Sequence, residues 1–111
     1  MLAEAAYYTN REGIARNMVN MIRARARQGQ PSNVLPDITS SGNQLLLDIW
    51  HERRVELCME QQRFFDLVRT GRVGGVMRAQ GVVFVDGKHE LLPIPQTERN
   101  LNPNLDQNDN Y

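Results

Sequence analysis

The sequence predicts a mainly α-helical fold: an αα-hairpin of tetratricopeptide type, a long helix, a short helix and an extended, proline-rich C-terminal segment. Apolar residues recur at helical spacing between residues 12 and 27 and again between residues 42 and 69. Gly71 and Gly81 stand where the two later helices should end, because glycine tolerates the left-handed conformation of a helix C-terminus. Proline in the 93–95 segment requires extended backbone before it.

Composition limits the classes of function. The 111 residues suit one small domain, and 13 basic residues balance 13 acidic ones. No net field therefore draws the chain to nucleic acid or to anionic lipid. Every basic residue except Lys88 is arginine, whose planar guanidinium suits partly buried carboxylate pairs, so we expect internal ion pairs. The single cysteine, Cys58, cannot form an internal disulfide, and no cysteine–histidine cluster suggests a metal or other cofactor.

The N-terminal part predicts the hairpin over residues 1–27. A first helix from Leu2 to about Tyr8 has no capping residue before it, as expected of a chain cut inside a helix. We therefore expect residues 1–111 to be the C-terminal fragment of a larger protein. Thr9 and Glu12 have the spacing of a capping box into a second helix that ends near Arg27. Residues 28–41, with two prolines and a polar cluster, predict a loop.

Residues 42–80 predict the remaining helices. Ser41 and Gln44 form a second capping-box pattern before a continuous helix over residues 42–69, and a short helix follows over about residues 72–80. On a continuous helix, several apolar side chains fall within about 40° of one line. They are Leu46, Trp50, Leu57, Phe64 and Val68. Arg53, Arg54 and Gln61 share this stripe, and a buried arginine requires a carboxylate such as Glu56, Glu60, Asp66 or Glu90.

Residues 81–111 predict an extended segment and a tail. Val82–Val85 is β-prone, and Asp86-Gly87 is typical of a hairpin turn. Residues 89–95 should be extended because of their prolines. The asparagine-rich end, residues 100–111, should be coil unless other residues order it.

Four motifs occur in order along the chain: HERRVEL at 51–57, RFFDLVRTG at 63–71, KHELLPIPQ at 88–96 and NPNL-x-QN at 102–108. Together, and with RARA at 23–26, they resemble the C-terminal signature of the SusD/RagB family. Two positions depart from the family pattern. Gln61 replaces a common glycine that breaks the helix, and Asp109-Asn110-Tyr111 replaces a common Pro-Gly-Tyr ending.

The resemblance implies a fragment of a superhelical, tetratricopeptide-like protein without catalytic activity. Proteins of this family are cell-surface lipoproteins of the outer membrane that serve polysaccharide utilisation. They bind glycans or other nutrients and act with a SusC-like, TonB-dependent transporter. No ligand-binding, catalytic or metal-binding residue follows from these motifs. We interpret a set of motif residues as structural, with the 53–66 part locking the long helix against the Pro93–Pro95 segment and the tail. The set is Arg53, Arg54, Glu56, Phe64, Phe65, Asp66, Glu90, Pro93 and Pro95.

Other readings of individual residues are weaker. His51-Glu52 suggests a zinc-binding helix, but Val55 stands where the second histidine would be. The row of Glu52, Glu56 and Glu60 is better explained as a solvated or arginine-paired face than as an acid–base pair. Cys58 lies near the edge of the apolar stripe and is therefore expected to be a small buried hydrophobic residue, since a nucleophilic cysteine would need a neighbouring histidine.

The remaining alternatives concern binding. The basic cluster Arg16, Arg23, Arg25 and Arg27 should spread around its helix, which disfavours nucleic acid. Trp50 is expected to pack in a core instead of stacking on a sugar. A helical protein–protein interaction module of tetratricopeptide type is the alternative function, on the strength of the hairpin. Apolar residues on two sides of the long helix predict self-association of the isolated chain.

Overall fold

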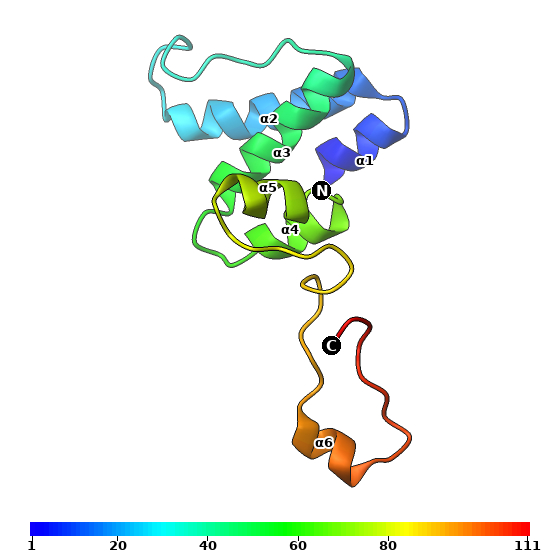
Figure 1. Ribbon diagram of the computed structural model, residues 1–111. Helices are drawn as coiled ribbons and strands as arrows, with labels where there is room; N and C mark the ends of the chain where they lie inside the picture. Colours follow the sequence, from blue (N-terminus) through cyan, green and yellow to red (C-terminus); the bar gives the residue numbers. More distant parts are fainter. The chain divides into compact units, whose positions relative to one another are not determined.

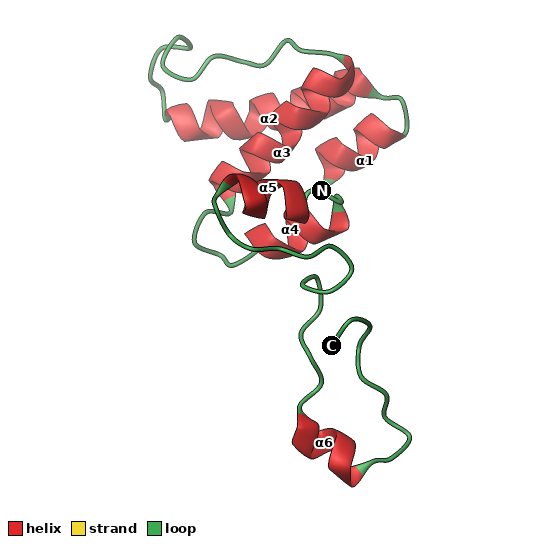
Figure 2. Ribbon diagram, in the orientation of Figure 1, coloured by secondary structure: helices red, strands yellow, loops and turns green.

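The computed structural model describes residues 1–111 as six helices joined by turns and loops, without a strand (Figures 1 and 2). The mainly α-helical prediction is therefore confirmed. The helices are α1 (Leu2–Tyr8), α2 (Glu12–Arg27), α3 (Gly42–Glu56), α4 (Arg63–Arg69), α5 (Val73–Ala79) and α6 (Gln96–Leu101). The chain divides into two compact units, Met1–Met59 and Glu60–Tyr111. None of the helices is long and apolar enough to cross a membrane.

The first unit contains the predicted αα-hairpin and α3. Small side chains let α1 and α2 pack closely, and the connection to α3 runs back along α2 (Figure 1). The buried residues of this core are Ala6, Ala15, Val19, Ile38, Leu45 and Ile49. Leu45 is the largest side chain that is fully buried. Because Ile38 lies outside the helices, the α2–α3 connection is itself part of the core.

Neither predicted capping box forms. Thr9 Oγ1 donates to the carbonyl oxygen of Ala5 at 2.9 Å, so it satisfies the end of α1 instead of the start of α2. Ser41 does stand at the N-cap of α3, as predicted, but its side chain makes no capping bond. The amide N–H of Gly42 instead donates to the Glu12 carboxylate at 3.0 Å. A carboxylate from α2 thus replaces the local cap.

The prediction of one continuous helix over residues 42–69 is wrong. α3 ends at Glu56 and α4 begins at Arg63. Between them, Met59 and Gln61 adopt φ angles of 71° and 59°, in the left-handed region, where an α-helix of L-residues cannot continue. Gln61 therefore takes the conformation for which the family pattern commonly has glycine. The predicted apolar stripe is split between two helices, and Cys58 in the connection is exposed, not buried.

The second unit has a smaller core made by Leu67, Val73 and Phe84. Gly71 and Gly81 have φ angles of 65° and 75° and follow α4 and α5, as predicted. Residues 82–85 form no strand, although they are β-prone.

The α5 helix explains why this run stays irregular. Arg78 Nη1 donates to the carbonyl oxygen of Phe84 at 3.1 Å and to the Asp86 carboxylate at 3.0 Å. A helix side chain, instead of a neighbouring strand, thus satisfies the carbonyl oxygen of Phe84. The turn at Asp86-Gly87 is present, but it joins no pair of strands.

The α6 helix does not follow from the sequence pattern. Its six residues are too few to show a hydrophobic period, and none of them is buried. Gln96 Nε2 donates to Asn100 Oδ1 at 2.8 Å, and Arg99 Nη1 donates to Gln96 Oε1 at 3.1 Å. The tail after α6 is coil, as predicted, and hydrogen bonds to residues 87–94 order it.

Candidate functional site

One side of α2 is hydrogen-bonded to the main chain of residues 35–42, and we call this arrangement the α2 ladder. Arg16 Nη1 donates to the carbonyl oxygen of Ser40 at 2.9 Å. Asn20 exchanges two bonds with Ile38, one to the carbonyl oxygen at 3.1 Å and one from the N–H at 2.9 Å. The further contacts are Glu12 with the N–H of Gly42 at 3.0 Å, Arg23 with the carbonyl of Pro36 at 2.7 Å and Arg27 with the carbonyl of Leu35 at 2.7 Å.

The register of the ladder follows from the geometry of the two segments. Four residues of an α-helix advance about 6 Å, and two residues of extended chain advance about 6.6 Å. Positions 12, 16 and 20 on the helix can therefore meet positions 42, 40 and 38 on a segment that runs the other way. The expectation that the arginines spread around the helix is wrong for Arg16, Arg23 and Arg27. Their spacing places them, with Asn20, on one side of α2.

Ion pairs connect the same helix to carboxylates, as the arginine bias predicted. Arg23 Nε lies 2.8 Å from Glu52 Oε2, and the two side chains are only 14% and 11% exposed. Arg25 pairs with Glu56, and Arg27 Nη1 lies 2.8 Å from Asp37 Oδ1. The arginine-paired interpretation of the glutamate row is thus confirmed for Glu52 and Glu56. Each arginine of the basic cluster has a carboxylate partner, Arg16 through Glu12, so the cluster forms no free phosphate-binding face.

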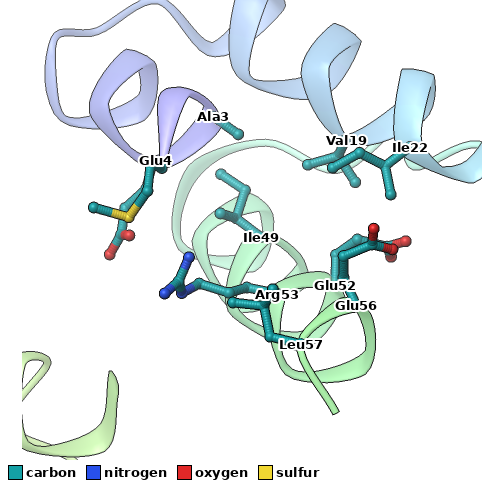
Figure 3. A pocket seen from close by; sticks show the side chains of 10 residues that line it. Ala3, Glu4, Val19, Ile22, Ile49, Glu52, Arg53, Glu56 and Leu57 are labelled. Atoms are coloured by element: carbon teal, nitrogen blue, oxygen red, sulfur yellow. The ribbon is translucent and has the colours of Figure 1, made fainter. Parts of the chain in front are cut away.

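A cavity of about 110 Å³ lies between α1, α2 and α3 (Figure 3). Its apolar lining includes Val19, Ile22 and Ile49. Glu52 and Glu56 project from one side of α3, and Arg53 projects from the other (Figure 3). The full lining is Met1, Ala3, Glu4, Val19, Ile22, Ile49, Glu52, Arg53, Glu56 and Leu57.

The carboxylates at this cavity are already engaged. Glu4, which is buried, accepts a hydrogen bond from the indole N–H of Trp50 at 2.8 Å. Trp50 is half-buried and is not part of either hydrophobic core, so the predicted packing of Trp50 in a core is not observed. Glu52 and Glu56 are paired with Arg23 and Arg25.

The cavity is small and mostly apolar. Ligand pockets typically enclose about 300–1,000 Å³, well above the volume found between these helices. Its lining contains no serine, cysteine or histidine. No group of three or more histidine, cysteine, aspartate or glutamate side chains is placed to hold a metal ion.

The predicted structural residues divide between the two units. In the first unit, Arg53 lines the cavity, Arg54 is exposed and Glu56 pairs with Arg25. The proposed lock to the Pro93–Pro95 segment stays a prediction.

In the second unit, Phe64 and Phe65 form an edge-to-face pair with ring centroids 6.4 Å apart, and Phe65 is 67% exposed. Asp66 Oδ1 accepts a hydrogen bond from Arg69 Nε at 2.9 Å. Glu90 Oε2 is buried without a hydrogen-bond partner. Pro93 and Pro95 are exposed.

The model of the SusD family (SusD_RagB) matches residues 1–111, the whole chain. This chain belongs to the SusD family. A comparison with curated proteins and with solved structures finds no match. Proteins of the SusD family bind nutrients at the cell surface and are not enzymes.

Asn20 and the α2 ladder of this SusD-family chain were not predicted from the sequence. The signal was available, because Glu12, Arg16, Asn20, Arg23 and Arg27 recur at three- and four-residue intervals. Such polar periodicity on a helix is usually assigned to solvent. Here it faces the main chain of residues 35–42.

Proposed function

We propose that this chain is a scaffold part of a SusD-like cell-surface protein that captures glycans or other nutrients and delivers them to a SusC-like, TonB-dependent transporter. Membership of the SusD family supports the nutrient-binding class. The observation that carries the scaffold role is the α2 ladder together with its ion pairs. These bonds engage the polar side chains of one face of α2 within the first unit, so this face stabilises the fold instead of contacting a ligand.

The cavity supports the same assignment. At about 110 Å³ it is too small for an oligosaccharide, and its carboxylates are engaged by Trp50, Arg23 and Arg25. We infer that the nutrient contacts of the whole protein lie outside this cavity. The nine structural motif residues then stabilise the scaffold without contacting the nutrient. Asp66→Ala should lower the melting temperature and leave the set of bound nutrients unchanged.

We place the whole protein on the outer face of the outer membrane as a lipoprotein, as its family suggests. The corresponding observation would be a lipid-modified N-terminal cysteine on the mature protein, detected by mass spectrometry. A mature protein that is released without lipid would contradict this placement.

The experiment that tests the function uses the intact protein that carries this segment. A glycan array followed by calorimetry should identify a saccharide or another nutrient that binds, and a SusC-like transporter should co-purify from membranes. Absence of any binding across saccharides and peptides, with no transporter recovered, would contradict the proposal.

A helical protein–protein interaction module is the second candidate. An open apolar surface on α1 and α2 favours it, lined by Met1, Leu2, Ala3, Met18, Met21, Ile22 and Arg25. Met21 on this surface is 64% exposed. One variant distinguishes the two functions. If the chain is a protein–protein interaction module, Met21→Glu should abolish binding of the protein partner. Under the nutrient-binding function, the same variant leaves nutrient affinity unchanged.

A further inference from the structure

The main chain of residues 87–94 presents carbonyl oxygens that need donors. Pro93 has no N–H, so residues 87–94 have one main-chain donor fewer than they have carbonyl acceptors. A neighbouring β-strand would supply N–H donors and carbonyl acceptors in equal number. Such a strand would leave a carbonyl oxygen of this segment without a donor. Side chains that donate hydrogen bonds are a better match.

The C-terminal residues supply such side chains. Gln107 exchanges two bonds with Ile94: its Oε1 accepts from the N–H at 2.7 Å, and its Nε2 donates to the carbonyl at 3.0 Å. The other bonds run to carbonyl oxygens: Asn108 Nδ2 to Leu92 at 2.6 Å, Asn110 Nδ2 to Gly87 at 2.8 Å and Tyr111 Oη to Leu91 at 2.9 Å. Asparagine, glutamine and tyrosine are thus placed opposite an acceptor-rich main chain.

A cation–π contact adds to these bonds. Lys88 Nζ lies 4.7 Å from the centroid of the Tyr111 ring. The segment has little apolar burial of its own, because Leu91 and Leu92 are 60% and 85% exposed. Hydrogen bonds from the tail therefore hold this segment together with the local turn bonds from the N–H groups of Lys88 and His89 to the carbonyl oxygen of Val85.

We propose that residues 107–111 form a strap that closes over residues 87–94 and keeps them in one conformation, and that the strap opens locally while α4 and α5 stay folded. Few buried apolar contacts and exposed hydrogen bonds are the features of segments that open at low free energy. Each strap bond is of the ordinary, weak kind, so a single substitution should shift the balance between the closed and open states.

Lysine occurs once in the chain, at position 88, within the segment under the strap. Within residues 1–111, an endoprotease specific for lysine therefore cleaves at one bond, between Lys88 and His89. Cleavage of a folded protein reports the population of the open state when opening and closing are fast. Gln107→Ala removes both bonds to Ile94 and should speed cleavage by roughly tenfold. Deletion of residues 107–111 should speed it further, and rates within about twofold of wild type for both variants would overturn the proposal.

A matched variant and a second measurement separate strap opening from general unfolding. Asp109→Asn changes an exposed strap residue whose side chain makes none of the strap bonds described above, and it should leave the cleavage rate unchanged. Amide hydrogen exchange in the Gln107→Ala variant should accelerate at Ile94, whose N–H bonds to Gln107. It should stay slow at Val76 in α5, whose N–H bonds to the carbonyl of Arg72, the N-cap of that helix. Equal acceleration at both amides would contradict local opening.

Discussion

In both units, side chains form hydrogen bonds with the main chain of an irregular segment, but these side chains belong to different kinds of structure. In the first unit they project from α2, a helix of 16 residues, and the segment contributes Ile38 to the core. In the second unit they project from a coil tail, and the segment leaves Leu92 85% exposed. A helix positions every donor at once, whereas a coil must be ordered residue by residue. We therefore expect the first unit to resist local opening and the second unit to open easily.

The largest effect should come from the core of the first unit. Leu45→Ala removes the largest fully buried side chain and should lower the free energy of unfolding by about 3 kcal/mol. Urea unfolding followed by the fluorescence of Trp50, the only tryptophan, reports on this unit. Leu47, on the same helix and 41% exposed, is the control, and its alanine variant should lose less than about 1 kcal/mol. Equal losses in the two variants would contradict the position of the core.

The ion pair between α2 and α3 should come next. Arg23→Met leaves Glu52, whose side chain is 11% exposed, without its guanidinium partner and removes the bond to Pro36. We expect a loss of about 2 kcal/mol in the free energy of unfolding, measured by the same fluorescence. Arg25→Met is the matched control, because Arg25 is 70% exposed and its pair with Glu56 should contribute below about 1 kcal/mol. A larger loss at Arg25 than at Arg23 would show that burial does not govern these pairs.

Alanine substitutions at the two adjacent glycines of α5 should change the stability of the second unit in opposite directions. A Cβ atom on Gly74 would lie 1.9 Å from Asp86 Oδ1 and 2.8 Å from Arg78 Nη2. Gly74→Ala should therefore displace the Arg78–Asp86 pair and destabilise the unit by about 1 kcal/mol. A Cβ atom on Gly75 meets nothing within 4 Å, so Gly75→Ala should stabilise the helix by up to about 1 kcal/mol. Thermal unfolding followed by far-ultraviolet circular dichroism checks both, and the same sign for the two variants would contradict the packing of α5.

The smallest expected effect concerns the break between α3 and α4. Gln61 has a φ angle of 59°, which glycine adopts at less cost. Gln61→Gly should raise the free energy of unfolding by about 0.5 kcal/mol, because relief of strain exceeds the added freedom of the unfolded chain. Gln62, at φ −83°, is the control, and its glycine variant should be neutral or destabilising. Stabilisation by Gln62→Gly and not by Gln61→Gly would contradict the break as described.

Local sequence patterns predicted most helices of this chain, because each of these helices has its own hydrophobic period and its own residue that ends it. α1 and α2 end where expected, and Gly71 and Gly81 follow α4 and α5. The break at residues 57–62 could not be predicted in this way, because Met59 and Gln61 are ordinary helix residues that take a left-handed conformation. The hydrophobic period also continues through it.

Tertiary partners explain the other errors. Glu12 has the right spacing for a box with Thr9 but bonds to Gly42, thirty residues away, which no local rule includes. The arginine bias predicted the internal ion pairs, since it reflects a property of the side chain itself. The register of the α2 ladder could not be predicted, because it depends on the direction and extension of residues 35–42. The structural motif residues were predicted from the family resemblance. The periodicity of apolar and charged residues alone would have indicated only some of them.

We propose that this SusD-family segment is scaffold and that its polar face on α2 stabilises the fold without contacting the nutrient. The most direct test measures both the melting temperature and the nutrient affinity of the intact protein carrying Arg23→Met. We predict a lower melting temperature with a Kd within about twofold of wild type, measured by calorimetry well below unfolding. A Kd weakened by roughly tenfold or more in a protein that is still folded would contradict the claim.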